Sequence, residues 1–496
     1  MNIDQKILDS IHSIPWDHVF ISDIPTGKQY TYKQFVQHAL QASAHIKQLN
    51  ADEIVLLLEN RYEMAVFYFA ALLGSIKVCP LDVLKGNQEI EKLLSLYPHT
   101  LIIDENGLGA DFHRSQCLDV KEIDIETTTP LDSDELKTAF DHIQWHKPFL
   151  TTYTSGTSGH MKGVEHSAHN LFSSAIAFRD HHKINAANTF YHVMPMAYMA
   201  GILNTFIVPF CANARVAIGP RFSPITAASF WTTALHNRLN TFWLSPTMAA
   251  MILKMDRGST GINYTRDTPC LIITATAPLT EKLRHEFQNK YATPLYQSYG
   301  LSETLLISSE SAAATEQALT CGKPLDGVEI TFENGEMLQK TPWTFLRYTN
   351  HPTEAYFSGS FYKTGDLAAF SAHGNLTVTG RLKDLIIRGG MNISGKLIED
   401  TVLKLDEVEE AAVFALPDSM MGEKIACAYV QSSHSHSSTR NSENPEEVNR
   451  RIHQRILSDL GSAHRIDQLI PCAEIPKNIN GKVDRLKLSQ QYAPIR

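Results

Sequence analysis

The stretch Thr151-Thr-Tyr-Thr-Ser-Gly-Thr-Ser-Gly-His-Met-Lys-Gly-Val164 is rich in glycine and in small hydroxyl residues. It follows Pro148-Phe149-Leu150, which is typical of a strand, and it precedes Asn170–Phe178, which is typical of a helix. Glycine lets backbone N–H groups turn toward an anion, hydroxyl groups add donors, and Lys162 adds positive charge. The spacing is not Gly-x4-Gly-Lys-Ser/Thr, so this is not the common nucleotide P-loop. Taken alone, the stretch is either a phosphate-binding loop or a flexible linker.

The composition is that of a globular enzyme with a substantial core. The chain has 496 residues, of which 43% are hydrophobic and 20% charged, so we expect two or more domains. The net charge of -9 and the lack of a basic block argue against a nucleic-acid partner.

The cysteines and the N-terminus indicate a cytoplasmic protein. Seven cysteines are scattered without a CxxC pair, which favours reduced thiols over disulfides or zinc. The N-terminus has no apolar segment typical of a signal peptide, and Ala65–Ile76, the longest apolar run, is too short to span a bilayer.

Short apolar segments alternate with helical patterns through most of the chain. This rhythm predicts an α/β fold whose large N-terminal domain has parallel-rich sheets flanked by helices. The expected strands are Ile54–Leu58, Val78–Leu81, Thr100–Ile103, Thr189–Val193, Ala214–Ile218, Thr241–Leu244 and Leu271–Ala275. We also expect a turn followed by an amphipathic helix within 29–47, and a helix at Tyr62–Leu73.

The pattern changes near Gly380. Beyond it, we expect short strands such as Ala411–Leu416 and amphipathic helices such as Leu397–Leu405 and Glu447–Leu460. We therefore predict a large domain at residues 1–380, a smaller α+β domain at 385–496, and a hinge at about 381–384.

Four further motifs follow in order along the chain. Gln297–Thr304 contains a Tyr-Gly pair followed by Ser302 and Glu303, and Tyr362–Asp366 places a carboxylate at an expected turn. Gly380–Ile393 joins Arg381 to a glycine hairpin, and Pro476–Arg485 sets Lys482 on a turn. Each motif alone is usually solvent-facing scaffolding.

With these five motifs in order, the chain resembles the adenylate-forming superfamily of acyl-CoA synthetases, carrier-protein ligases, nonribosomal adenylation domains and luciferases. The resemblance covers nearly the whole chain. It implies ATP, Mg2+ and CoA, or a carrier protein's phosphopantetheine, as cofactors, and a small carboxylic acid as substrate.

The resemblance also implies a role for each matching residue. Lys482 would bridge the substrate carboxylate and the α-phosphate, Ser302 would contact that phosphate, and Glu303 would carry Mg2+. Lys383 would be the hinge, and Gly389 with Gly390 would flank the thiol tunnel. The ATP- and AMP-binding set would be Thr154, Ser155, Gly156, Thr157, Ser158, Gly159, Lys162, Ala275, Thr276, Ala277, Ser298, Tyr299, Gly300, Asp366 and Arg381. Within this set, Tyr299 would stack on adenine and Asp366 would bind both ribose hydroxyls.

Some positions depart from the family pattern, and they concern the acid and the thiol. Tyr198 stands where other members have histidine or aspartate, which disfavours an α-amino acid as substrate. Ala275 and Ser298 stand where many members have glycine, so we expect a narrow acyl pocket formed by Tyr198, Ala275 and Ser298. The segment between Gly327 and Tyr362 is compressed, and Asn392–Leu397 is unusual, so the handling of CoA is open.

Three functions remain to be distinguished. The leading one is an AMP-forming acid–thiol ligase that uses CoA, and the closest alternative transfers the acyl group to a carrier protein. A non-catalytic nucleotide-binding relative is the third. The sequence argues against this third function, because a site that has lost its catalytic activity has no reason to keep all four of Glu303, Asp366, Arg381 and Lys482.

Overall fold

The computed structural model describes most of the chain. The described residues are 3–105, 117–125, 130–155, 161–277, 279–312, 319–432, 444–477 and 482–492.

A mixed sheet of seven strands contains the glycine-rich stretch. Its five strands β7, β4, β3, β5 and β6 are parallel, while β8 and β18 are antiparallel additions at one edge. The strands in spatial order are β18 (Arg347–Tyr348), β8 (Met161–Ser167), β7 (Pro148–Ser155), β4 (Lys77–Pro80), β3 (Glu53–Leu57), β5 (Leu101–Asp104) and β6 (Cys117–Asp119).

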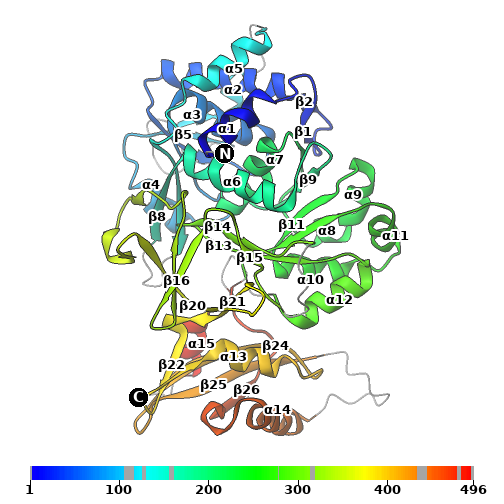
Figure 1. Cartoon of the computed structure of the whole chain (residues 1–496), viewed down its shortest axis with the longest axis vertical. Coiled ribbons are helices and arrows are strands. Elements are labelled where there is room, and N and C mark those ends of the chain that lie inside the picture. Colours follow the sequence, from blue (N-terminus) through cyan, green and yellow to red (C-terminus); the bar gives the residue numbers. More distant parts are fainter. Residues whose placement is uncertain are drawn as a thin grey trace.

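A second, nine-stranded sheet lies beside it in sequence and in space (Figure 1). Six consecutive strands from β13 to β1 are parallel, and antiparallel strands close both edges. The order is β15 (Lys323–Pro324), β14 (Leu305–Ser309), β13 (Tyr296–Leu301), β12 (Leu271–Thr274), β11 (Thr241–Leu244), β9 (Thr189–His192), β10 (Arg215–Ile218), β1 (Val19–Asp23) and β2 (Gln29–Thr31).

One apolar core joins both sheets to their helices. It contains Phe35 of a helix, Ile54 of the first sheet and Phe242 of the second, all of them buried. The helices of this part are α1 (Ile3–His12), α2 (Tyr32–Gln48), α3 (Tyr62–Gly74), α4 (Asn87–Leu94), α5 (Ser133–Asp141), α6 (Ala168–His182), α7 (Val208–Cys211), α8 (Pro224–Ala228), α9 (Phe230–Asn237), α10 (Pro246–Met255), α11 (Thr260–Asp267) and α12 (Glu281–Tyr291). A π-helix, η3 (Ala200–Ile207), precedes α7, and a short 3-10 helix, η2 (Val120–Glu122), follows β6.

A third, antiparallel sheet follows the nine-stranded one in sequence. It carries two of the expected nucleotide-binding residues on neighbouring strands, with Asp366 of β20 directly opposite Arg381 of β21. Its strands are β16 (Glu329–Glu333), β17 (Glu336–Lys340), β20 (Phe361–Phe370), β19 (Phe357–Ser358) and β21 (Leu376–Arg381). The short helix η4 (Glu354–Tyr356) leads into β19.

The last part of the chain forms a fourth sheet with apolar clusters of its own. Buried residues such as Ile398, Ile425 and Ile452 make one cluster, and Phe414 with Leu488 belongs to another. The elements are η5 (Leu382–Asp384), β22 (Leu385–Arg388), β23 (Met391–Ser394), α13 (Gly395–Val402), β24 (Val408–Asp418), β25 (Gly422–Gln431), α14 (Pro445–Leu460), η6 (Ser462–His464), β26 (Gln468–Pro471) and α15 (Arg485–Tyr492). Figure 1 shows this part, in orange to red, as a separate layer beyond β20 and β21.

The α/β fold expected from the sequence is confirmed, and its strand and helix bounds agree within a few residues. Thr241–Leu244 is a strand at the expected bounds, whereas Ala411–Leu416 is only the middle of the longer strand β24. The expected turn at Asp366 is instead part of strand β20. Among the residues the structure describes, no helix is long and apolar enough to cross a bilayer. All seven cysteines are free thiols.

Candidate active site

Asp366 is the centre of a buried hydrogen-bonded group. Its carboxylate Oδ1 accepts from Arg381 Nε at 2.8 Å, and its Oδ2 accepts from the Tyr299 hydroxyl at 2.5 Å. Asp366 is 1% exposed, so both bonds are charge-assisted contacts in a medium of low dielectric constant. Burial raises the pKa of Asp366, while Arg381, Tyr299 and Lys482 act in the opposite direction. These contacts hold the carboxylate in one orientation and leave lone pairs for further donors.

Strand pairing explains how this group forms. Arg381 ends β21 directly opposite Asp366 in β20, so their side chains are neighbours across the antiparallel pair. Tyr299 comes from β13, the third strand of the nine-stranded sheet counted from β15, and packs against the small apolar cluster of Cys321, Met337 and Leu376. The site therefore lies where the second and third sheets meet.

Glu303 lies on the turn after β13 and is held by two contacts. The Tyr348 hydroxyl donates to its Oε1 at 2.8 Å, and the Phe345 N–H donates to its carbonyl at 2.8 Å. The hydroxyls of Tyr348 and Tyr362 lie 3.0 Å apart, so the two phenols form a short chain behind the carboxylate. Mg2+ prefers carboxylate and phosphate oxygens, so Glu303 together with a nucleotide's phosphates fits the ligand set of that ion.

Ser302, the neighbour of Glu303, is fixed through its backbone. His166 Nε2 lies 2.6 Å from the Ser302 carbonyl oxygen, so this ring nitrogen donates. Burial lowers the pKa of His166 to about 4, which keeps the imidazole neutral. Gly300 approaches the opposite strand so closely that a Cβ there would lie 2.1 Å from the Leu305 carbonyl oxygen. Only glycine fits at that position.

The described residues of the glycine-rich stretch belong to the antiparallel strands β7 and β8. Thr154 pairs with Lys162 and Ser155 with Met161, while Gly156, Thr157, Ser158 and Gly159 lie outside the described residues. Lys162 Nζ donates to the Tyr356 hydroxyl at 2.6 Å and lies 5.0 Å from the centre of the Tyr348 ring. The Tyr348 hydroxyl also donates to Glu303, so Lys162 and the Glu303 carboxylate both contact the Tyr348 side chain.

Lys482 reaches this group from the last part of the chain. Partial burial lowers its pKa, and the charges of Arg381 and Lys383 act in the same direction, while Asp366 and Glu303 oppose them. The residue nevertheless keeps access to solvent. Burial also lowers the pKa of Lys383, in the short helix η5 that joins the third and fourth sheets. Lys482 is thus close enough to Arg381, Asp366 and Glu303 for their charges to affect its pKa.

Other expected residues have their contacts elsewhere. Ser298 is buried in β13 and its hydroxyl donates to the Ser308 carbonyl at 2.9 Å, while Ala275, Thr276 and Ala277 follow the end of β12. Thr276 has a φ of 75°, a left-handed conformation that is strained for a β-branched residue. Gly389 and Gly390 form the tip of the β22–β23 hairpin at positive φ, and the Gly389 N–H donates to the Met421 carbonyl.

Tyr198 lies beside an ion pair that the sequence did not predict. Arg221 donates to both carboxylate oxygens of Asp82, at 2.6 and 2.9 Å. Burial and the negative charge of Asp82 raise the pKa of Tyr198 to about 12. The sequence analysis also missed Tyr348, Tyr356 and Tyr362. The run of aromatic residues between 345 and 362 is a signal that could have pointed to them.

The family comparison agrees with this geometry. The model of the AMP-binding enzyme matches residues 10–359, and that of the AMP-binding enzyme C-terminal domain matches residues 397–482. The chain therefore belongs to the AMP-binding enzyme family, and its resemblance to the adenylate-forming superfamily is confirmed.

Individual relatives are distant. Malonate–CoA ligase of Arabidopsis thaliana is 24% identical over 69% of this chain, and the match spans 60% of that ligase's own length. Long-chain-fatty-acid–CoA ligase FadD13 of Mycobacterium tuberculosis is 26% identical over 89% of this chain and 88% of its own. The crystal structure of ATP-bound MatB from Rhodopseudomonas palustris has a TM-score of 0.82 at 20% identity, with 99% of each chain covered. At that identity, the structural likeness concerns the fold.

Proposed function

We propose that this protein is an ATP-dependent, AMP-forming ligase that activates a carboxylic acid as an acyl-adenylate and transfers the acyl group to a thiol. One observation carries the proposal: Arg381 and Tyr299 hold the Asp366 carboxylate at 2.8 and 2.5 Å, and the charges of Asp366 and Glu303 act on Lys482. With Asp366 on the ribose and Glu303 on Mg2+, as proposed, a cation close to both carboxylates could neutralise charge at the α-phosphate of ATP.

In the first half-reaction, a carboxylate oxygen of the acid attacks the α-phosphorus of ATP and pyrophosphate leaves. Both reactants are anions, so catalysis rests on charge neutralisation and on positioning. Protonated Lys482 bridges the attacking carboxylate and the α-phosphate, and Ser302 donates to that phosphate. Glu303 would hold Mg2+, which would supply positive charge to the phosphate oxygens.

The nucleotide is oriented by groups from three sheets. Asp366 accepts hydrogen bonds from the ribose hydroxyls while Arg381 and Tyr299 fix its carboxylate. The face of Tyr299 and the backbone of 275–277 line the adenine pocket. The glycine-rich stretch from Thr154 to Lys162 binds the β- and γ-phosphates.

In the second half-reaction, a thiol sulfur attacks the acyl carbonyl, the bond to the AMP oxygen breaks, and AMP leaves. We propose that residues 385–496 rotate as a unit about Lys383 between the two steps, so that Gly389 and Gly390 replace Lys482 beside the adenylate. CoA is the leading thiol, and the phosphopantetheine arm of a carrier protein is the alternative. Parallel assays with CoA and with a loaded carrier protein distinguish them.

The relatives do not identify the acid substrate, because their names extend from malonate to long-chain fatty acids. The shape of the pocket is the better guide to it. We propose a short or a flat aromatic acid, because Ala275 and Ser298 add atoms where glycine would leave space. Tyr198 offers a hydroxyl rather than a carboxylate, and the neighbouring Asp82 carboxylate is already paired with Arg221, which disfavours an α-amino acid.

Acid-dependent exchange of labelled pyrophosphate into ATP tests the proposed function. Exchange with at least one member of a panel of acids, and its loss in Asp366→Asn, is the expected result. A protein that binds ATP but exchanges pyrophosphate with no acid would instead be the non-catalytic nucleotide-binding relative. Since ATP and CoA are abundant in the cytoplasm, we propose that compartment.

A further inference from the structure

We infer that Glu399 and Arg485 form a clamp that positions Lys482 for the adenylation step. Glu399 lies on α13, and Arg485 is the first residue of α15, three positions after Lys482. The inference rests on the proposed function and adds two positioning residues to it. Neither side chain is expected to touch the substrates.

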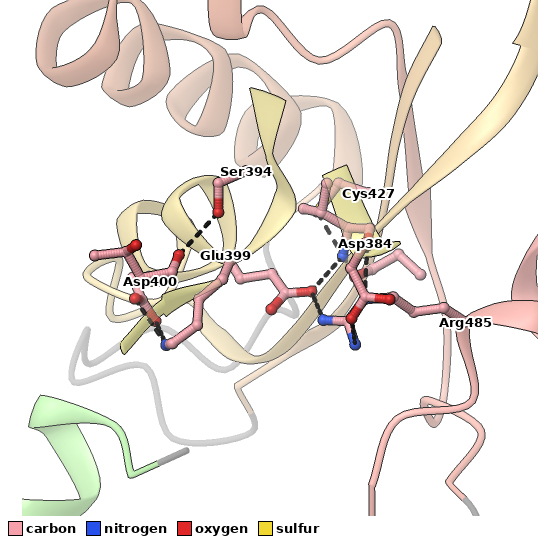
Figure 2. Close-up of polar contacts among 10 residues, drawn as sticks. Asp384, Ser394, Glu399, Asp400, Cys427 and Arg485 are labelled. Atoms are coloured by element: carbon pink, nitrogen blue, oxygen red, sulfur yellow. Dashed lines mark hydrogen bonds and ion pairs between the residues drawn. The ribbon is translucent and has the colours of Figure 1, made fainter. Parts of the chain in front are cut away.

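The clamp is built around the backbone of Val413 in β24. Glu399 Oε1 accepts from the Val413 N–H at 2.7 Å and from Arg485 Nη2 at 2.5 Å. Arg485 Nε in turn donates to the Val413 carbonyl at 3.0 Å. Three hydrogen bonds therefore close a ring that joins the start of α15 to α13 and β24. Figure 2 shows the Arg485 guanidinium between Glu399 and Asp384.

The pair is sheltered enough for its charge to matter. The Glu399 side chain is 12% exposed and that of Arg485 is 30% exposed. Burial raises the pKa of Glu399, and the charge of Arg485 opposes that rise. The negative charge of Glu399 also adds to the burial effect that raises the pKa of the buried Cys427 thiol. Removing one partner would leave the other charge poorly solvated, which is the costly way to break such a pair.

The clamp connects the lysine to the hinge. Arg485 Nη1 lies 4.0 Å from a carboxylate oxygen of Asp384, the residue after Lys383. On the other side, Val483 pairs with Lys477, and the Asp484 N–H donates to the Pro476 carbonyl at 2.8 Å. The residues just after Lys482 are thus bonded to residues 476–477 and, through Arg485, to the hinge segment.

This arrangement gives the clamp a specific role in one half-reaction. A lysine side chain has four flexible bonds, so its backbone must be held if the ammonium is to meet the α-phosphate. A displacement of about 1 Å in a positioned group can cost about 10²-fold in rate. The thiol-transfer step does not use Lys482, so a loosened clamp should leave it nearly unchanged.

The test uses the full-length protein and the variants Glu399→Gln and Arg485→Gln. Each should lower the kcat of adenylation by about 10- to 100-fold, while thiolysis of a supplied acyl-adenylate stays within about twofold. Arg485→Lys should give an intermediate loss, because an ammonium cannot reach Glu399 and the Val413 carbonyl together. Hydrogen exchange should rise at residues 482–488 in the two glutamine variants.

Asp400→Asn is the matched control. Asp400 is the next residue on α13 and forms an exposed ion pair with Lys396, so this variant removes one negative charge from the same helix without touching the clamp (Figure 2). It should keep the wild-type rates and exchange pattern.

Each result decides between distinct explanations. If Glu399→Gln and Arg485→Gln slow both half-reactions alike, the pair is a folding element and the positioning role is wrong. If they behave like Asp400→Asn, the clamp has no function. If the wild type exchanges pyrophosphate with no acid, the proposed function fails first, and the clamp proposal falls with it.

Discussion

The Tyr299 phenol donates a 2.5 Å hydrogen bond to the Asp366 carboxylate, so a residue expected to face the adenine also fixes the residue expected to bind the ribose. The two side chains come from different sheets. The nucleotide recognition proposed above would therefore depend on the contact between the nine-stranded sheet and the antiparallel sheet that follows it.

Tyr299→Phe should weaken ATP binding about tenfold. A hydrogen bond to a charged group is worth about 1.5–3 kcal/mol, and a factor of ten corresponds to about 1.4 kcal/mol. The ring itself remains, so contact with adenine is kept. Calorimetric titration with ATP measures the change. Tyr264→Phe is the control, because the Tyr264 hydroxyl donates at 2.6 Å to the Leu239 carbonyl and should affect stability alone. Unchanged ATP affinity in Tyr299→Phe would show that the phenol does not hold Asp366 for the nucleotide.

Lys482→Ala should slow adenylation by about 10²–10³-fold, the usual cost of losing one preorganised charge partner. Thiolysis of a supplied acyl-adenylate should be spared, since only the first step brings two anions together. Rapid-quench measurement of each half-reaction gives both rates. Equal damage to the two steps would contradict the role assigned to this lysine.

Acid should destabilise the protein through its buried histidines. Burial lowers the pKa of His192 to about 4, whereas an unfolded histidine has a pKa of about 6.5. Below about pH 6.5 this histidine is protonated in the unfolded chain but not in the folded protein. The free energy of unfolding therefore falls as the pH is lowered, until about pH 4. The loss from one such histidine is about 3 kcal/mol at most.

Urea unfolding of His192→Asn between pH 7 and pH 4.5 tests this expectation. The asparagine amide can replace the ring nitrogen Nδ1, which lies 2.6 Å from the Thr205 hydroxyl. The variant should lose less stability over that pH range than the wild type. If the free energy of unfolding changed with pH equally in the variant and the wild type, His192 would be protonated in the folded state as it is in the unfolded chain. His166 and His182, whose pKa values burial lowers to about 4 and about 3, should supply the remaining slope.

The strands could be predicted because they are short apolar runs between polar segments, a local property. Which strands pair is not local. Asp366 was expected at a turn, yet it lies in β20 opposite Arg381, a register that the spacing of either motif does not reveal. The family resemblance put Tyr299 and Asp366 in one nucleotide-binding set but did not predict the hydrogen bond between them. The contact of the Tyr348 and Tyr362 phenols with Glu303 was missed, because the aromatic run between 345 and 362 does not reveal which residue it packs against.

Ser298 gives the most direct test of the acyl pocket. It is 5% exposed, and its hydroxyl is held by the Ser308 carbonyl, so the side chain has a fixed position. If its atoms narrow the pocket, Ser298→Gly should shift the preference toward bulkier acids and leave ATP binding little changed. Each methylene of the acid that fits the pocket adds about 0.8 kcal/mol of binding free energy, whereas one that does not fit causes a steric clash. The wild type should therefore discriminate sharply between acids of neighbouring chain lengths.

Ser298→Ala separates the two effects of that substitution. It removes the bond to Ser308 but keeps the Cβ atom, so the acid profile should stay close to that of the wild type, while Ser298→Gly should move it. The measurement is pyrophosphate release across a series of acids of increasing length. If the wild type already prefers long-chain acids, or if alanine and glycine shift the profile equally, the pocket is not narrowed by this residue.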